Sequence, residues 1–489
     1  MTEELTEAVR KYLSATLRKL QDPSRERLGK ESLAILKNRA LELQMLVNEL
    51  EDQPEFAELG GQTAAAFSTA KSSFNDLWQP HVGNFFRRSG FYAAVYDGKN
   101  PDAERTLNEY LEAFQRHKVK VTHLAPIELV EFDGSDFDFD TFKIKRFSPT
   151  ELHQLVGNEV NEIFYEYAAI NAQTLSQYWF IEITEDVVPP ERGSGGLIDL
   201  SGRIQIRYSS FPKAVEKAIQ TLSLYDWSQW SRYGSDEGDV TTGWTRFNIP
   251  FVLTVDDNIL EQPAIAPDTS VLSTEPVPDP NTGEFVGEEP ARLIDMCDDK
   301  ASIDFRVFVR RAAMGFSSFC ANQEAKPFME TALGYFLKAF FSEGLEQLLW
   351  HIAVVEALLG DREGEGLTTR LKKRLGSILG DTKEERKAIM KRFDALYAFR
   401  SDLVHANCDL GEKEIYLGHL REAHEIARKT LLWFLKYVED ISYQYMGNTT
   451  LLPTREDMIH TLDMDQGSRS RIKRLIEVLP DDFPRSFSS

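Results

Sequence analysis

The sequence contains little cysteine, no long apolar run, and fewer basic than acidic residues. Three of its 489 residues are cysteines, Cys297, Cys320 and Cys408, which are too few and too scattered for a disulfide framework or a zinc site. No apolar run approaches the roughly 18–20 residues of a membrane-spanning helix. The start Met1-Thr-Glu-Glu also lacks the basic and apolar regions of a signal peptide. We therefore expect a cytoplasmic protein that has no membrane span and needs neither a metal nor another cofactor.

The formal net charge of -22 is unusual for a protein that binds nucleic acid, because contacts with phosphates favour basic surfaces. The charge is unevenly distributed, however. Residues 251–300 contain twelve Asp or Glu and two Lys or Arg, whereas residues 366–400 contain ten Lys or Arg and four Asp or Glu. A basic run of this kind is either a solvated helical face or a surface for an anionic partner, and both interpretations stay open.

Length and pattern predict an α+β multidomain protein. Residues 1–120 have helical composition, and residues 121–255 form a mixed α+β module. Residues 256–298 are an acidic, proline-rich linker, expected to be a surface excursion or a hinge. Residues 299–446 then form an all-α bundle, and residues 447–489 form a tail. In the N-terminal helices we expect core packing or a helical hairpin that binds a partner.

Four short runs rich in aromatic and β-branched residues predict strands in the α+β module, at 142–147, 178–183, 203–208 and 247–253. An aromatic cluster follows the third run. Aromatic rings can stack on unpaired bases, but they more often fill a core or a domain contact, which we expect here. The cluster consists of Tyr225, Trp227, Trp230, Tyr233, Trp244 and Phe247.

One stretch carries groups suited to phosphate chemistry, Tyr397-Ala-Phe-Arg400-Ser401-Asp-Leu-Val-His405-Ala-Asn407. An arginine binds phosphate oxygens through paired hydrogen bonds, and a histidine moves protons near neutral pH. Together they suffice for RNA cleavage without a metal, because a base activates the 2′-hydroxyl and a cation stabilises the charge on the phosphate. The spacing alone is weak evidence, since about one chance match is expected in a chain of this composition.

A predicted helix upstream supports the motif. Residues 342–360 place leucines and Ile352 on one apolar face, and Glu356 falls on that same face. A carboxylate on an apolar face needs a partner, because burying it alone costs several kcal/mol. Arg400 is the expected partner of Glu356.

With these residues in place, the segment resembles the Apea-like branch of the HEPN superfamily (higher eukaryotes and prokaryotes nucleotide-binding). The likeness covers about residues 300–445. It consists of a helix ending Val355-Glu356-Ala-Leu-Leu-Gly360, a basic helical segment, the pattern Tyr-x-x-Arg-Ser-x-x-Val-His-Ala and a long closing helix. It implies an all-α HEPN bundle, commonly dimeric, and a metal-independent endoribonuclease whose products are a 2′,3′-cyclic phosphate and a 5′-hydroxyl.

The resemblance implies that Arg400 and His405 are catalytic, and that Glu356 and Ser401 hold the geometry. Asn407 either orients the imidazole or the phosphate, or forms a turn. The residues expected to bind RNA are Arg370, Lys372, Lys373, Arg374, Lys391 and Arg392.

The same resemblance implies the partners and the setting. We expect an RNA substrate, a homodimer through the HEPN domain, and a phage-derived or protein trigger at the N-terminal module. The setting is bacterial anti-phage defence by abortive infection. Two alternatives stay open. One is a non-catalytic interaction or dimerisation module, in which Arg400 only pairs with Glu356, and the other is a nucleotide-binding module.

The remaining histidines of the helical region are weaker candidates. His419 and His424 are five residues apart and so do not share one helix face, which disfavours a metal pair. His351 adjoins the apolar stripe and is expected to be packed or hydrogen-bonded in the core.

Overall fold

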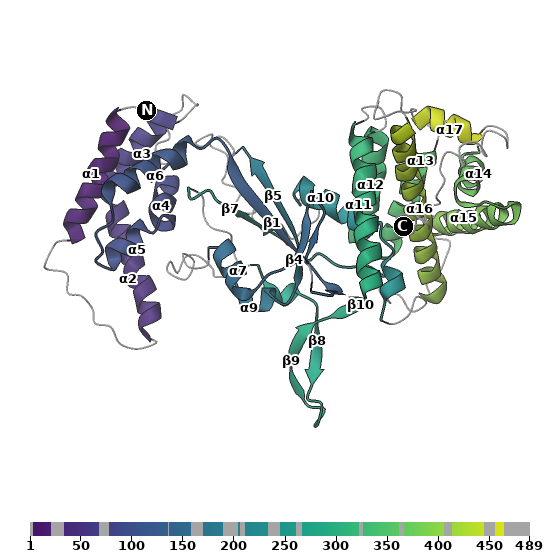
Figure 1. Ribbon diagram of the computed structural model, residues 1–489, viewed down its shortest axis with the longest axis horizontal. Helices are drawn as coiled ribbons and strands as arrows, with labels where there is room; N and C mark the ends of the chain where they lie inside the picture. The colour runs from purple at the N-terminus through teal and green to yellow at the C-terminus, as the bar shows by residue number, and fades with distance from the viewer. Residues whose placement is uncertain are drawn as a thin grey trace. The chain divides into compact units, whose positions relative to one another are not determined.

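The fold comes from a computed structural model of the chain, drawn in Figure 1. Its helices and strands fall into two compact units, each built from separate stretches of sequence. Unit 1 contains residues 1–126, 142–211 and 249–272, and unit 2 contains residues 127–141, 212–248 and 273–489. The structure describes residues 3–20, 34–67, 78–134, 136–157, 170–188, 204–205, 211–232, 245–260, 267–321, 326–360, 366–404, 413–444 and 455–463.

The N-terminal part of unit 1 is helical, as its composition predicts. Its core is aromatic: the rings of Phe85, Phe86 and Tyr110 lie 5.0–5.8 Å apart, and all three side chains are fully buried. Asp102 begins the last of these helices by accepting two backbone amides, which is typical of an N-cap. The helices are α1 (Glu3–Leu20), α2 (Ala34–Glu51), α3 (Pro54–Phe67), α4 (Gln79–Arg88), α5 (Phe91–Tyr96) and α6 (Ala103–Gln115).

A polar chain runs through this helical core. The hydroxyls of Tyr12 and Tyr92 are 2.8 Å apart, and Tyr92 donates to Glu51 at 3.3 Å. Arg87 binds both oxygens of the Glu51 carboxylate at 2.9 Å. Gly83 leaves room for this pair, since a Cβ there would lie 2.5 Å from Arg87 Nη1 and 2.7 Å from Glu51 Oε1. The buried charge is therefore paired, as burial requires.

The sheet of unit 1 follows the helices. Its strands are β1 (Val119–Ile127), β4 (Lys143–Arg146), β5 (Trp179–Val187), β6 (Ile204–Gln205) and β7 (Val252–Asp256), and they lie in the order β4-β5-β1-β7-β6. Three of the four neighbouring pairs in this order, β4–β5, β1–β7 and β6–β7, are antiparallel. One face packs against α7 (Pro149–Leu155) and α9 (Ala172–Leu175) through a cluster that includes Leu124, Phe180 and Leu253.

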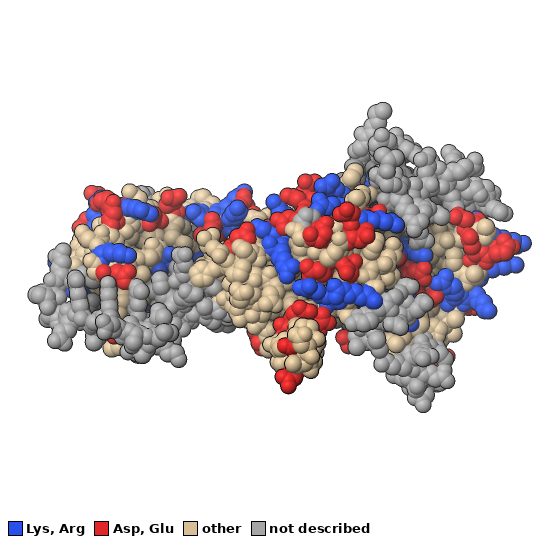
Figure 2. All heavy atoms as spheres, turned by 60° about the horizontal axis from the view of Figure 1, so that its bottom comes forward, with Lys and Arg blue, Asp and Glu red and all other residues tan. Residues whose placement is uncertain are grey.

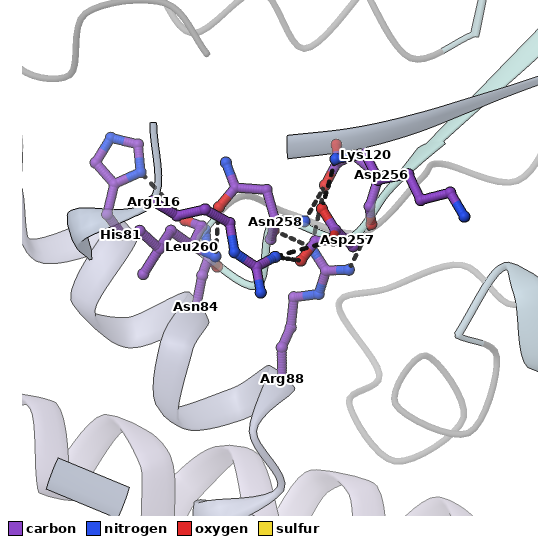
Figure 3. Close-up of polar contacts among 9 residues, drawn as sticks. All are labelled: His81, Asn84, Arg88, Arg116, Lys120, Asp256, Asp257, Asn258 and Leu260. Atoms are coloured by element: carbon purple, nitrogen blue, oxygen red, sulfur yellow. Dashed lines mark hydrogen bonds and ion pairs between the residues drawn. The ribbon is translucent and has the colours of Figure 1, made fainter. Parts of the chain in front are cut away.

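Figure 3 shows how the chain beyond β7 is fixed to α4 and α6. The backbone carbonyl of Leu260 is contacted by His81 Nδ1 and by Asn84 Nδ2, each at 3.1 Å. Arg88, at the end of α4, donates to the Asn258 carbonyl at 2.6 Å. These bonds satisfy buried carbonyls of an irregular segment, which would otherwise cost free energy.

A second set of contacts holds Asp256 and Asp257, which come just before Asn258 in the same segment. Arg116 follows α6 and donates to Asp257 Oδ2 at 2.9 Å, while Asp257 Oδ1 accepts the Lys120 amide at 2.8 Å. Arg88 Nη1 also lies 3.8 Å from Asp256 Oδ1. The helices and the sheet of unit 1 are thus joined by charged hydrogen bonds as well as by chain connectivity.

Unit 2 contains strands in the segment predicted to be a linker. β2 (Leu129–Phe132) pairs in parallel with β10 (Arg292–Met296), although the two are far apart in sequence. Between Leu272 and β10, β8 (Thr274–Pro278) and β9 (Phe285–Pro290) form an antiparallel hairpin, which projects in Figure 1. Residues 256–298 are therefore not a plain linker: the alternating pattern of β10 was obscured by acidic and proline residues around it. The short strand β3 (Phe137–Asp138) also belongs to unit 2.

The rest of unit 2 is helical. Within the part of the chain that is described, no helix is both long and apolar enough to span a membrane. Tyr225, Trp227 and Phe247 are buried and lie around Phe305 and Phe340, so these three fill a core. Trp230 is half-buried and donates to the Tyr225 hydroxyl at 2.8 Å. Tyr233 and Trp244 lie outside the described residues. The helices are α10 (Lys213–Ser223), α11 (Asp299–Ala321), α12 (Lys326–Phe341), α13 (Gly344–Leu359), α14 (Leu367–Leu379), α15 (Lys383–Val404), α16 (Lys413–Gln444) and α17 (Arg455–Asp463).

Candidate functional site

Helix α15 carries the Arg400 motif close to its C-terminal end. Its start is fixed by a reciprocal capping arrangement: Thr382 Oγ1 accepts the Glu385 amide at 3.1 Å, and Glu385 Oε2 accepts the Thr382 amide at 3.0 Å. Phe393 and Leu396 are buried and turn one face of α15 inward. A rigid helix therefore presents Tyr397, Arg400 and Ser401 within one turn of each other.

Glu356 and Arg400 are connected through Tyr397 rather than directly. The Tyr397 hydroxyl donates to Glu356 Oε1 at 2.8 Å. The Arg400 guanidinium carbon lies 5.5 Å from the centre of the Tyr397 ring, within the range of a cation–π contact. Burial, together with the Glu356 carboxylate, raises the pKa of Tyr397. The predicted ion pair of Glu356 with Arg400 is wrong, because neither residue forms an ion pair in the described part of the chain. Tyr397, three residues before Arg400, donates a hydrogen bond to the Glu356 carboxylate instead.

The Arg400 side chain is half-buried. Its Nε atom is buried and has no acceptor among the described residues. No described carboxylate forms an ion pair with this guanidinium. Ser401 is half-buried on the next position of the helix. His405 and Asn407 lie outside the described residues, so their predicted roles stay predictions.

His419 is a candidate that sequence reasoning gave too little weight. It lies on α16 with its ring centre 4.4 Å from that of Phe399, the residue before Arg400. Tyr416, one turn earlier on α16, is 6.1 Å from the same Phe399 ring. Burial lowers the pKa of His419, and Glu422 opposes this shift. The i, i+3 spacing of an aromatic and a histidine on α16 was a usable signal, because both turn toward one neighbouring helix.

The six residues predicted to bind RNA do not share one environment. Lys373 and Lys391 are exposed, and Arg370 is half-buried. Lys372 pairs with Asp394 at 2.8 Å. Arg392 pairs with Glu422 at 2.5 Å and with Glu425 at 3.0 Å, so it joins α15 to α16.

Arg374 is the clear exception. Its side chain is 2% exposed, and it binds both carboxylate oxygens of Asp463 on α17 and the Leu359 carbonyl. Its predicted RNA contact is therefore wrong: the guanidinium is enclosed and ties α14 to α13 and α17. A basic run in a sequence does not reveal which of its members turns inward.

A row of lysines remains on the solvent side of α15. Lys383, Lys387 and Lys391 are exposed and lie four residues apart, so they share one face of the helix. We call these three residues the lysine stripe. Blue side chains gather in Figure 2 at the end of the molecule where Figure 1 places α15.

Two other histidines of unit 2, His351 and His424, pack against each other. The His351 side chain on α13 is fully buried, that of His424 on α16 is half-buried, and their rings are 5.2 Å apart. Burial, with Arg246 adding to it, lowers the pKa of His351 to about 3, and burial also places that of His424 well below its usual value. Both rings are therefore neutral at physiological pH. Among the described residues, no group of three or more His, Cys, Asp or Glu is arranged to hold a metal.

Unit 1 contains one further polar constellation. His123 on β1 lies 2.9 Å from Thr254 Oγ1 on β7 through Nδ1, and 3.1 Å from Glu185 Oε1 on β5 through Nε2. Burial lowers the pKa of His123, and Glu185 opposes this shift. The three side chains form a cross-strand link over adjacent strands, which helps to fix their register.

Comparison with known proteins identified no relative of the chain. No protein-family model matches the chain, and no curated protein or solved structure matches it.

Proposed function

We propose that the chain is a metal-independent endoribonuclease of HEPN type, acting as an RNA-cleaving effector in bacterial anti-phage defence. The observation that supports this most is that Arg400 has no carboxylate partner among the described residues. Glu356, the carboxylate best placed to neutralise it, accepts the Tyr397 hydroxyl instead. A half-buried guanidinium that has no carboxylate partner in the described part of the chain is suited to bind a phosphate.

In the proposed reaction His405 accepts the proton of the RNA 2′-hydroxyl. The 2′-oxygen attacks the adjacent phosphorus, the bond from phosphorus to the 5′-oxygen breaks, and the leaving 5′-oxygen takes up a proton. The products are a 2′,3′-cyclic phosphate and a 5′-hydroxyl. Arg400 holds non-bridging phosphate oxygens and stabilises the added negative charge of the transition state. No metal and no water take part in this step.

Glu356 and Tyr397 are positioning residues in this proposal. The carboxylate fixes the phenol, and the phenol ring supports the guanidinium, so the orientation of Arg400 depends on α13 through Tyr397. Ser401 and Asn407 stay candidates for holding the phosphate and the imidazole. Pre-orienting an arginine lowers the entropy lost when the substrate binds.

Exposed lysines on α14 and α15 would add phosphate contacts to that of Arg400, although the lysine stripe lies on the face of α15 opposite to Arg400. The lysine stripe supplies phosphate contacts on the same helix, and Lys373 on α14 is exposed as well. Such contacts are independent of RNA sequence and weaken with salt. The Arg400–His405 motif supplies one arginine and one histidine per chain, so we propose that two HEPN domains face each other in a homodimer and double this set.

Incubation of the purified chain with total RNA, with and without EDTA, tests the activity. The proposal expects cleavage that survives the chelator and products that end in a cyclic phosphate. Cleavage that EDTA abolishes would contradict it. Intact RNA under all conditions would favour the non-catalytic interaction module.

A further inference from the structure

A second group of side chains flanks Arg400 on the side of α15 away from Tyr397. On an α-helix, the position three residues before Arg400 is rotated by about 60° to one side, and the position one residue before it by about 100° to the other. Tyr397 therefore lies on one flank of Arg400 and Phe399 on the other. The centre of the Phe399 ring is 4.4 Å from that of His419 and 6.1 Å from that of Tyr416, both on α16. We call Phe399, Tyr416 and His419 the aromatic flank.

The aromatic flank is partly open and carries polar atoms that the described chain does not use. All three side chains are half-buried, as is Arg400. Among the described residues, neither the Tyr416 hydroxyl nor a ring nitrogen of His419 has a hydrogen-bond partner. The buried Nε atom of Arg400 has no acceptor there either. Polar groups inside a core are nearly always hydrogen-bonded, so this arrangement is better suited to hold a ligand than to fill a core.

Tyr416 is placed by α13 as well as by α16. Gly344, the first residue of α13, has a φ of +59°, and a Cβ there would lie 2.9 Å from the Tyr416 hydroxyl oxygen. A glycine adopts this left-handed conformation without strain and leaves room for the phenol. The Tyr416 ring is therefore fixed while its hydroxyl stays without a partner among the described residues.

The charge state of the aromatic flank suits a nucleobase better than a phosphate. Burial lowers the pKa of His419, with Glu422 opposing the shift, and burial raises the pKa of Tyr416. Both side chains are therefore neutral at physiological pH. Neutral rings offer a face on which a base can stack, and their polar atoms can bond the edge of the base. A phosphate instead favours the permanent charge of Arg400.

We propose that the aromatic flank is a subsite for an unpaired base next to the phosphate that Arg400 holds. The base stacks on the side of the His419 ring away from Phe399, and the Tyr416 hydroxyl bonds its edge. A helix with its side chains is only about 10–12 Å across, so one nucleotide can reach both groups. A base inside a duplex is stacked and paired, so it cannot enter. This inference rests on the proposed function, and it makes single-stranded RNA the substrate.

Binding of a fluorescent oligonucleotide tests the subsite without cleavage. A short single-stranded RNA with every 2′-hydroxyl replaced by fluorine cannot undergo the proposed reaction. Spaced 2-aminopurine bases in it lose fluorescence when they stack. We expect the full chain to quench this fluorescence and to bind the strand more tightly than the duplex with its complement. His419→Leu fills similar space without a ring, so it should weaken single-strand binding at least about fivefold, abolish the quenching and leave duplex binding unchanged.

Matched variants separate stacking from packing. His419→Phe keeps an aromatic face and should retain most of the quenching, whereas a side chain that only packs on Phe399 would be replaced equally well by leucine. Tyr416→Phe loses only the hydroxyl and should weaken single-strand binding about threefold. His460→Leu makes the same change at an exposed position of α17 and should alter nothing. The salt dependence of binding should keep its slope in His419→Leu, because no phosphate contact is lost. Thermal melts verify that each variant is folded.

The outcomes distinguish the subsite from the ribonuclease. Absent single-strand binding, equal binding of single strand and duplex, wild-type quenching by His419→Leu, or loss of quenching in folded His419→Phe would each overturn the subsite. Quenching that depends on His419 in a chain that cleaves no RNA would leave the subsite standing and refute the ribonuclease. Equal cleavage rates for single-stranded and duplex RNA would support the ribonuclease and overturn the subsite.

Discussion

Tyr397 donates its hydroxyl to Glu356 over 2.8 Å, and its ring lies beneath the Arg400 guanidinium. Through these two contacts, the orientation of the Arg400 guanidinium on α15 depends on the position of α13. Among the described residues, Arg400 has no carboxylate partner. The distinction between a structural arginine and a phosphate-binding one depends on this relationship.

The link predicts a difference between two conservative variants. Tyr397→Phe removes the hydroxyl but keeps the ring under Arg400, so RNA cleavage should fall by about tenfold with little change in melting temperature. Tyr397→Leu removes the ring as well and should lower cleavage further, about 100-fold. Single-turnover rates of the two variants measure this. Equal rates for the wild type and Tyr397→Leu would remove Tyr397 from the site.

Glu356 should matter less for stability than a buried ion pair would. Glu356→Ala leaves the Tyr397 hydroxyl without its acceptor, which costs about 1–2 kcal/mol of unfolding free energy. An ion pair broken in a buried site would cost about 3–5 kcal/mol. Urea denaturation separates these values. A loss at the upper value would indicate that Glu356 pairs with Arg400 in solution.

Arg374 should be essential for stability and not for RNA affinity. Arg374→Ala leaves Asp463 without its partner and opens space beneath Leu359, so we expect a loss of about 2–4 kcal/mol. Lys373→Ala, the exposed neighbour, should change stability by no more than about 0.5 kcal/mol. Denaturant melts of the two variants give the comparison. Similar losses in both would contradict the enclosed position of Arg374.

His351 and His424 predict acid sensitivity. Burial lowers both pKa values in the folded state, so the unfolded chain, with histidine near its ordinary pKa of about 6.5, binds more protons. Stability is therefore fully present above about pH 6.5 and falls as the pH decreases from there toward about 3. His424→Gln should flatten the fall between pH 7 and pH 5, and His460→Gln on the exposed side of α17 should not. Unchanged pH dependence in His424→Gln would contradict the buried pair.

The local sequence pattern was sufficient to predict helices and strands that form from neighbouring residues. The expected strands at 142–147 and 178–183 correspond to β4 (Lys143–Arg146) and β5 (Trp179–Val187). The helical character of both ends of the chain also follows from apolar spacing, and the structure confirms a mixed α+β protein with a helical C-terminal region. The run at 247–253 was placed too early, since β7 spans Val252–Asp256.

Features that depend on distant partners could not be read from the sequence. β10 finds β2 more than a hundred residues away, and nothing in its acidic surroundings indicates that pairing. Arg374 turns inward because Asp463 and Leu359 meet it there, while its neighbour Lys373 stays in water. Likewise, Glu356 was expected to select Arg400, but Tyr397 reaches it first. The type of a residue limits the contacts that it can make, and its neighbours in the folded structure determine which of these contacts forms.

The most direct test of the proposed ribonuclease is cleavage of one defined RNA in EDTA under single-turnover conditions. We expect the wild-type chain to cut it to a 2′,3′-cyclic phosphate and a 5′-hydroxyl, and to leave uncut the same RNA with a 2′-deoxy nucleotide at the scissile position. Arg400→Ala and His405→Ala should each abolish the reaction while melting near the wild-type temperature. Wild-type cleavage rates in folded Arg400→Ala or His405→Ala, or cleavage of the 2′-deoxy RNA, would contradict the account.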